Sequence, residues 1–256
     1  MIYETKNTMC AAHLFDGWQE TIVWSCLQGV MGSLSVDDLR APRSAAVRLG
    51  DFYFLAGEPM PELVLRERDR QDFLIMVPRH PGWEQEIEGC FGSAAKKVTR
   101  YAMKKEPDAF DKEALRAFAE KTPEGYALKM IDEPLFLQCQ TLAWCRDFVS
   151  QYTDFAQYEA YGLGTVLLKD GELVAGASSY SGYIGGIEIE IDTREDYRRR
   201  GLATICGARL ILECLRRGLY PSWDAQNLWS VALAQKLGYH FDYAYTAYEI
   251  IGGDFR

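Results

Sequence analysis

Six consecutive residues in the second half of the chain carry the clearest chemical signal. They are Arg198, Arg199, Arg200, Gly201, Leu202 and Ala203. An alternating apolar stretch precedes them and a long apolar stretch follows, so they lie at a predicted strand–loop–helix junction. The free N–H groups at the start of a helix, with about half a positive charge from the helix dipole, attract anions. Glycine lets the backbone approach a ligand closely, and arginines add charge and donors. The junction therefore predicts a pyrophosphate-binding site.

The same six residues also fit a simpler structure, a capped surface helix behind a solvated basic loop. Other phosphate-binding motifs are not found in the sequence. It contains no G-x-x-x-x-G-K followed by Ser or Thr, and no predicted strand followed by G-x-G-x-x-G. A P-loop and a Rossmann dinucleotide site are therefore not supported, and the context of the junction has to decide.

The elements on both sides of the junction are well defined in the sequence. Residues 187–191 read Ile-Glu-Ile-Glu-Ile. This alternation predicts a strand with the isoleucines on one face and Glu188 and Glu190 on the other. Residues 202–217 are apolar nearly all round, which predicts a buried helix that Gly218 ends.

The rest of the second half predicts a regular order of strands and helices. Asp170 and Gly171 favour a hairpin turn between two strands. The other predicted strands lie at residues 126–131, 164–169, 173–180 and 219–223, with helices at 134–149 and 227–237 and a final strand pair at 239–251.

The first half predicts a mixed α/β arrangement without a motif of chemical meaning. Asp111 is a good N-cap for a helix at residues 112–121. Further helices are predicted at 18–28 and 82–91, with strands at 45–49, 52–55 and 97–104 and an apolar stretch at 73–77 that Pro78 ends. We therefore expect two domains, an N-terminal α/β domain of unknown role at residues 1–124 and a domain that carries the chemistry at residues 125–256.

Composition narrows the class of protein. The chain has 256 residues, of which 48% are hydrophobic and 25% charged, as in ordinary globular proteins. The N-terminus lacks signal-peptide features and no apolar stretch is long enough for a membrane helix, so we expect a cytoplasmic protein without a membrane partner. Its seven cysteines are scattered and form no C-x-x-C pair, which predicts buried free thiols and no metal site.

The net charge of −9 disfavours nucleic acid as a partner and mildly favours a cationic substrate. The acidity is equally explained by solubility alone. His13, His80 and His240 are isolated in the sequence and are expected to be structural.

Three separated blocks resemble a GNAT acetyltransferase. They are residues 187–203, the segment Pro-Ser-Trp-Asp-Ala-Gln-Asn at 221–227 and the segment Leu-Ala-Gln-Lys-Leu-Gly-Tyr at 233–239. Within that superfamily the sequence closely resembles the subfamily that includes the zwittermicin A resistance protein. The resemblance to the general core covers about residues 126–251, and the subfamily likeness extends upstream through 100–106 to Trp83.

This resemblance implies an acyl-CoA N-acyltransferase fold of the α/β (α+β) class. Such a fold has a mixed, mostly antiparallel sheet flanked by helices, here with an α/β N-terminal domain. It also implies that the strand at 187–191 separates from the strand at 219–223, and that acetyl-CoA, the cosubstrate, enters the gap. The pantetheine arm would pair with backbone at Ile191, Asp192 and Thr193, as a strand adds to a sheet edge.

The pyrophosphate would lie on the N–H groups from Arg199 to Thr204, beside Arg198. Asn227 matches the family asparagine that faces the cofactor at the start of the next helix.

Glu190 and Glu188 are the candidate general bases, because a Glu of this strand has that role in several family members. Both are alternatively exposed strand residues, or groups that orient an amine without taking its proton. Asp224 is a rival base and could equally cap the following helix. Many members use a Tyr as the acid, but the matching position here is Ala234, so Ser230 is the candidate donor to the CoA sulfur. The alternatives are that water donates or the thiolate leaves unprotonated, with Ser230 an ordinary helix residue.

Three functions remain open at this stage. The first is an enzyme that acetylates a primary amine of a small cationic molecule. The second is an acetyltransferase for a protein N-terminus or lysine. The third is a non-catalytic acyl-CoA-binding or scaffold protein, which the Ala at position 234 motivates. A homodimer is compatible with all three.

Overall fold

The chain divides into two compact units. The computed structural model describes residues 1–67 and 73–251. The N-terminal unit comprises Met1–Arg100 and the chain from Ala244 onwards, and the C-terminal unit comprises Tyr101–Tyr243. This division differs from the predicted boundary after residue 124. Residues 101–124 belong to the C-terminal unit because α4 (Lys112–Ala119) packs against α7 (Leu202–Arg216).

The N-terminal unit is built on a mixed sheet. Its strands lie in the order β1-β2-β3-β4-β5-β13, followed by β6. Strand β4 pairs with β5 in parallel, and the pairs from β1 to β4 and between β5 and β13 are antiparallel. The bounds are β1 Tyr3–Thr5, β2 Ser33–Val36, β3 Ser44–Leu49, β4 Phe52–Gly57, β5 Phe73–Pro78, β6 Ala95–Met103 and β13 Phe241–Ile251, with helices α1 Thr21–Leu27, α2 Pro61–Leu65 and α3 Pro81–Phe91.

The core of this unit joins the sheet to α2 and α3. Trp83 is fully buried, with Tyr53, Met76 and Tyr248 packed in the same cluster. Its indole donates to the carbonyl of Gly57 at 3.1 Å, so the large ring is also fixed in orientation.

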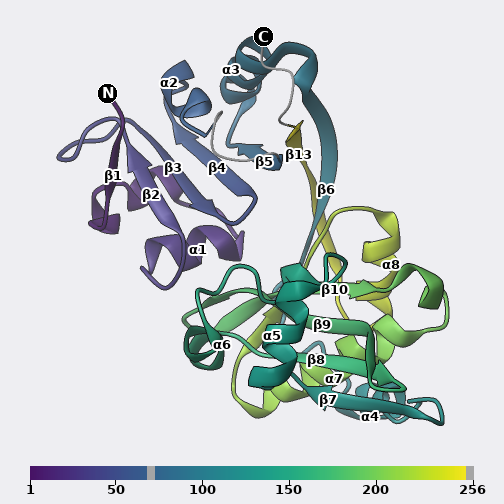
Figure 1. Cartoon of the computed structure of the whole chain (residues 1–256). Coiled ribbons are helices and arrows are strands. Elements are labelled where there is room, and N and C mark those ends of the chain that lie inside the picture. The colour runs from purple at the N-terminus through teal and green to yellow at the C-terminus, as the bar shows by residue number, and fades with distance from the viewer. Residues whose placement is uncertain (68–72, 252–256) are drawn as a thin grey trace. The chain divides into compact units, whose positions relative to one another are not determined.

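The C-terminal unit contains a second sheet in the order β11-β10-β9-β8-β7. All neighbours are antiparallel except β10 and β11, which are parallel. Figure 1 shows α7 and α4 on one face of this sheet and α5 and α6 on the other. The bounds are β7 Tyr126–Met130, β8 Gly164–Lys169, β9 Glu172–Tyr183, β10 Gly186–Thr193, β11 Tyr220–Ser222, β12 Asp224–Ala225, α5 Glu133–Thr141, α6 Phe155–Tyr161 and α8 Leu228–Lys236, with a short 3-10 helix, η4, at Arg146–Phe148.

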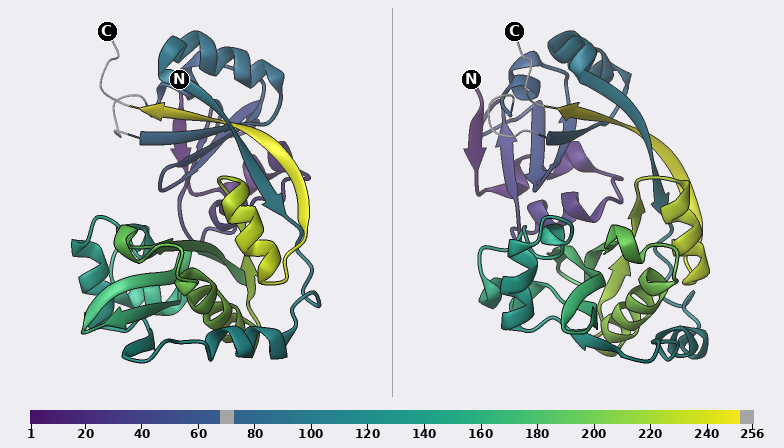
Figure 2. Two further views of the ribbon diagram at one scale, coloured as in Figure 1. Left: turned by 90° about the vertical axis from the view of Figure 1, so that its right-hand side faces the viewer. Right: turned by 45° about the vertical axis from the view of Figure 1, so that its right-hand side comes forward.

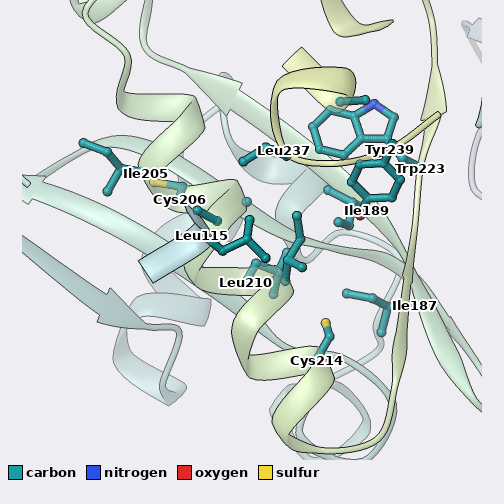
Figure 3. Packing of buried hydrophobic residues seen from close by; sticks show 14 of the residues in the cluster. Leu115, Ile187, Ile189, Ile205, Cys206, Leu210, Cys214, Trp223, Leu237 and Tyr239 are labelled. Atoms are coloured by element: carbon teal, nitrogen blue, oxygen red, sulfur yellow. The ribbon is translucent and has the colours of Figure 1, made fainter. Parts of the chain in front are cut away.

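The alternation in β10 sorts its side chains between the two faces as predicted. Ile187 and Ile189 are buried in the core with Leu210 and Cys214 of α7 (Figure 3). Glu188 and its neighbours of the same parity lie on the opposite face, which η4 contacts. Because the isoleucines are buried on one face of β10, the two glutamates must lie on the other face.

Glycines define both ends of α7. Gly201 is its N-cap residue with φ 79°, and Gly218 follows its last turn with φ 71°. Both lie in the left-handed region, which glycine adopts without steric cost. The predicted helix at 202–217 is confirmed to within one residue.

Three element predictions were wrong. The helix predicted at 134–149 ends at Thr141, where Leu142 turns to extended backbone, and only η4 continues it. The strand predicted at 219–223 is divided at Trp223, because β11 pairs with β10 whereas β12 pairs with β6. The predicted final pair is a single long strand, β13, in both views of Figure 2.

Two further observations concern the whole chain. No helix among residues 1–67 and 73–251 is long and apolar enough to span a membrane. All seven cysteines are free thiols, and five of them are buried, as the sequence predicted.

Candidate active site

A pocket of about 360 Å³ lies in the C-terminal unit where β10 ends and α7 begins. Its lining combines the strand end, the arginine loop, the first turn of α7 and one side of α8. The lining residues are Ile191, Asp192, Thr193, Tyr197, Arg198, Arg199, Gly201, Leu202, Ala203, Trp229 and Leu233. Most residues predicted to bind the cofactor therefore meet in one place. Arg200, Thr204, Asn227 and Ser230 are not among the lining residues.

Strands β10 and β11 separate before β10 reaches this pocket. They pair only through Gly186, Ile187 and Glu188, which face Tyr220, Pro221 and Ser222. Beyond Glu188 the strand β10 continues to Thr193 and pairs with β9 alone among the described strand pairs. One edge of β10 thus carries backbone groups that an extended ligand could pair with.

The loop before α7 has a backbone suited to an anion. Arg199 has φ 61° and Gly201 has φ 79°. Left-handed backbone is uncommon for arginine, so the surrounding structure must hold Arg199 in this conformation. A Cβ built on Gly201 meets no atom within 4 Å, so space for a ligand lies in front of the helix start. The first N–H groups of α7 face this space without intrahelical partners.

The three arginines of the loop have different roles. Arg198 donates from Nε to the carbonyl of Thr193 at 3.1 Å and lies 3.5 Å from Asp192. Arg200 donates to the carbonyl of Asp196 at 2.8 Å, with its guanidinium over the ring of Tyr197. These two side chains hold the loop. Arg199 has no hydrogen bond or ion pair within the described residues, and its exposed guanidinium is available to a ligand.

Asp192 brings a carboxylate to the pocket wall. Burial raises its pKa, against the lowering effects of the Thr193 N–H and of Arg198. Because Arg198 partly neutralises it, the carboxylate leaves the loop a net basic site.

The two candidate bases have different surroundings. Glu188 is 7% exposed, whereas Glu190 is half-buried. Glu188 pairs across the sheet with Ser181 on one side and Ser222 on the other, at the point where β10 and β11 separate. The Oγ of Ser181 is buried and has no hydrogen-bond partner among the described residues. Buried atoms of this kind are commonly bonded to ordered water.

Three tyrosines surround Glu188. Burial raises the pKa of Tyr220 to about 12 and also raises the pKa values of Tyr183 and Tyr239, and the charge of Glu188 adds to each rise. The phenols therefore stay protonated. Tyr183 shares a hydrogen bond of 3.2 Å with Ser222, and Tyr239 donates to the carbonyl of Pro221 at 2.6 Å.

The start of α8 holds the remaining candidates. The side chain of Asn227 accepts from the N–H of Ser230 at 3.0 Å and so is the N-cap. Asp224, proposed from the sequence as an alternative cap, lies in β12 instead. The hydroxyl of Ser230 accepts from Nε1 of Trp223 at 3.0 Å and keeps its own proton for donation.

A family model described as GNAT acetyltransferase matches residues 12–248. The chain belongs to the GNAT acetyltransferase family. The solved structure of a GCN5-related N-acetyltransferase-like protein from Streptococcus suis 89/1591 is 46% identical, with a TM-score of 0.91 over 95% of this chain and 98% of that chain. The expected GNAT fold is therefore confirmed, and the protein is a GNAT family N-acetyltransferase.

Two other relatives are more distant. The uncharacterized N-acetyltransferase YdfB of Bacillus subtilis (strain 168) is 27% identical in an alignment of 252 positions that covers 91% of this chain and 91% of that protein. A tandem GNAT protein from the clavulanic acid biosynthesis pathway is 12% identical, with a TM-score of 0.55 over 100% of this chain and 99% of that chain. The second likeness concerns the fold alone.

Position 234 of this GNAT acetyltransferase is closed to a large side chain. Ala234 is fully buried in the core cluster with Leu237 and Tyr239. A Tyr there would need space that the core does not have. The packing of α8 therefore accounts for an Ala where many family members have a Tyr.

The sequence analysis missed Tyr197, Trp229 and Leu233 as lining residues. Trp229 and Leu233 are four residues apart on α8, so they share one face of the helix. This spacing after Asn227 is a signal that the sequence carries.

A second pocket, of about 520 Å³, lies in the N-terminal unit of this GNAT acetyltransferase, and His13, Arg43 and Glu58 are among its lining residues. His80 also lines it. Its Nδ1 accepts from the N–H of Gly82, and its Nε2 donates to the carbonyl of Gly57 at 3.0 Å. His80 is thus the N-cap of α3, which confirms its structural role.

Proposed function

We propose that this protein transfers the acetyl group of acetyl-CoA to a primary amine of a small cationic molecule. The observation that carries the proposal is the pocket at the start of α7, where a left-handed loop, free N–H groups and an unpaired strand edge meet. Helix starts of this kind bind phosphate groups. The thioester of acetyl-CoA would supply the activated acetyl group.

The residues of the pocket fit this cosubstrate. The pyrophosphate would bind the N–H groups from Arg199 to Thr204, with the Arg199 guanidinium as an added donor. The open space at Gly201 admits it without a steric conflict. The pantetheine arm would pair with the edge of β10 at residues 191–193.

A carboxylate of β10 would remove the proton of the amine, because only a neutral amine attacks a thioester. Glu188 is the stronger candidate, since it lies where β10 and β11 separate and Ser181 beside it has an unsatisfied buried Oγ. A water on Ser181 would carry the proton to Glu188. Glu190, two residues further along the same face, is the alternative.

Ser230 would donate to the departing sulfur. Its hydroxyl is oriented by the bond from Trp223, which leaves the hydroxyl proton free to point elsewhere. Asn227 would act through the helix cap that holds Ser230 in place.

The acceptor class rests on charge and on the subfamily resemblance. A net charge of −9 attracts cations. The resemblance to the subfamily of the zwittermicin A resistance protein supports an amino-bearing small molecule. Cytoplasmic location, suggested by seven free thiols, and a homodimer belong to the same proposal.

Binding of acetyl-CoA to wild type and to Gly201→Asp, measured by calorimetry, tests the proposal. The aspartate places a side chain and a negative charge in the space in front of α7. Gly218→Asp is a matched control, because Gly218 has φ 71° and also has no atom within 4 Å of a built Cβ. Both variants carry a similar backbone cost, but only Gly201 lines the pocket.

Wild type and Gly218→Asp are expected to bind acetyl-CoA, and Gly201→Asp is expected to lose binding. Release of CoA thiol with a panel of primary amines then identifies the acceptor. Failure of the wild type to bind at millimolar ligand would contradict the proposal, as would equal binding by both variants.

A further inference from the structure

Trp229 is a large aromatic side chain that lies mostly in solvent. It lies in the first turn of α8, with 87% of its surface exposed. An indole exposed to this extent leaves a wide apolar face in water, and a ligand that covers it gains free energy from the burial. Nothing in the proposed acid–base chemistry uses this residue.

The position of Trp229 relates it to the phosphate end of the pocket. It lines the same pocket as Gly201 and Arg199. Leu233, one turn further along α8, also lines it. Lys236, on the same side of α8, donates to Oγ1 of Thr204 in the first turn of α7 at 3.3 Å. One face of α8 thus follows the start of α7, with the indole at its exposed end.

The two ends of the proposed cosubstrate would lie in different surroundings. The reacting end lies near Glu188, which is 7% exposed, whereas the indole is 87% exposed. The pantetheine arm has the edge of β10 as its partner. The part of the molecule beyond the phosphates is a flat purine base, and a flat indole is a good stacking surface for it.

We infer that Trp229 stacks against the purine base of the cosubstrate and so selects a nucleotide-bearing acyl donor over a simple phosphopantetheine thioester. This inference rests on the proposed function. It gives the exposed face of α8 a role in donor selection, which no catalytic residue of the site supplies.

Calorimetric binding of CoA and of 4′-phosphopantetheine, which lacks the nucleotide, tests the inference. The variants are Trp229→Ala, Trp229→Phe and Leu228→Ala. Leu228 is the matched control, because it is 65% exposed in the same turn and does not line the pocket. Both side chains are exposed, so none of the three substitutions removes a side chain from the core.

Trp229→Ala is expected to weaken CoA binding by roughly 5- to 150-fold, the range of base–aromatic stacking, and to leave binding of 4′-phosphopantetheine unchanged. Trp229→Phe should retain part of the preference, and Leu228→Ala should match the wild type. Equal weakening of both ligands by Trp229→Ala would overturn the inference, because the indole would then contact the shared arm. Unchanged CoA binding would also overturn it. A wild type that binds no CoA would instead reject the proposed function, and the inference with it.

Discussion

Glu188 and Glu190 share a face of β10 but differ in their surroundings. The buried Glu188 lies between Ser181 and Ser222, where an arriving amine would lose most of its water. Glu190 pairs with Ser178, whose hydroxyl donates to the carbonyl of Phe148 at 2.7 Å. The difference predicts unequal roles in proton transfer.

Glu188→Gln is expected to lower kcat by roughly 10²–10⁴-fold, the usual contribution of a general base, with little change in acetyl-CoA affinity. The loss should shrink at alkaline pH, where more of the amine is already neutral. Glu190→Gln is the matched control. Thiol release across a range of pH, with an acceptor from the amine panel, measures both. Full activity of Glu188→Gln would transfer the role to Glu190 or to water.

The sequence predicted the part of the candidate site that consecutive residues form. Arg198 to Ala203 are consecutive, so a motif could identify them before the fold was known. Trp229 and Ser181 come from other elements, and their meaning depends on which surfaces the sheet brings together. The burial that leaves the Ser181 hydroxyl unsatisfied has no signature in the sequence, because serine is common in exposed and buried strands alike.

Among the helices, α7 has an ionic cluster at its C-terminal end. The carboxylate of Glu213 accepts from Arg216 at 2.6 and 3.0 Å and from Arg217 at 2.9 Å. Arg216, and then Arg217, hold the pKa of Glu213 at about 2 against the opposing effect of burial. Arginines at this end of a helix complement its dipole, and the cluster adds a buried partner for them.

Glu213→Gln is expected to lower the free energy of unfolding by about 1–3 kcal/mol at neutral pH. The folded pKa lies below the ordinary value of 4.5, so the cluster stabilises the fold above pH 4.5 and loses this effect as pH falls towards 2. The gap between variant and wild type should therefore narrow over this range. Urea unfolding at several pH values measures it.

Glu172→Gln, in β9, is the control for this prediction, because Glu172 bonds to Arg194 at 2.9 Å but its side chain is 72% exposed. It should change stability by well under about 1 kcal/mol. A gap that stays constant between pH 4.5 and about 2 would contradict the assignment of the effect to Glu213 ionisation.

Element predictions failed where tertiary contacts overrode local pattern. The apolar stretch after Thr141 has helical spacing, but the chain turns at Leu142 and η4 buries Phe148 against the sheet. In contrast, Asp111 was predicted as an N-cap and does accept from the N–H groups of Glu113 and Ala114. An N-cap can be predicted from a few neighbouring residues. The end of α5 instead reflects the packing of the following η4 against β9, which is distant in the sequence.

At the scale of the whole molecule, the two units do not follow the order of the chain. The core of the C-terminal unit includes Met103, Phe110 and Leu115, all of which precede the predicted boundary after residue 124. The sequence placed that boundary before the first GNAT-like strand because the general family core begins there. The packing of α4 against α7 has no motif of its own.

A fragment of residues 125–256 is expected not to fold cooperatively. It would lose three buried apolar side chains from the core, each worth about 1.5–3 kcal/mol, which is comparable to the total stability of a domain. Circular dichroism and limited proteolysis would measure this, with the full chain as the control. A sharp unfolding transition of the fragment would show that residues 101–124 are dispensable.

The return of β13 to the N-terminal unit has a consequence for synthesis on the ribosome. Tyr248 and Ile250 complete the N-terminal core by pairing with Met76 and Leu74. The unit that is translated first must therefore wait until β13 has been made, while the unit inserted within it, Tyr101–Tyr243, is already complete. A nascent chain would therefore complete its C-terminal unit before the unit with which its translation begins.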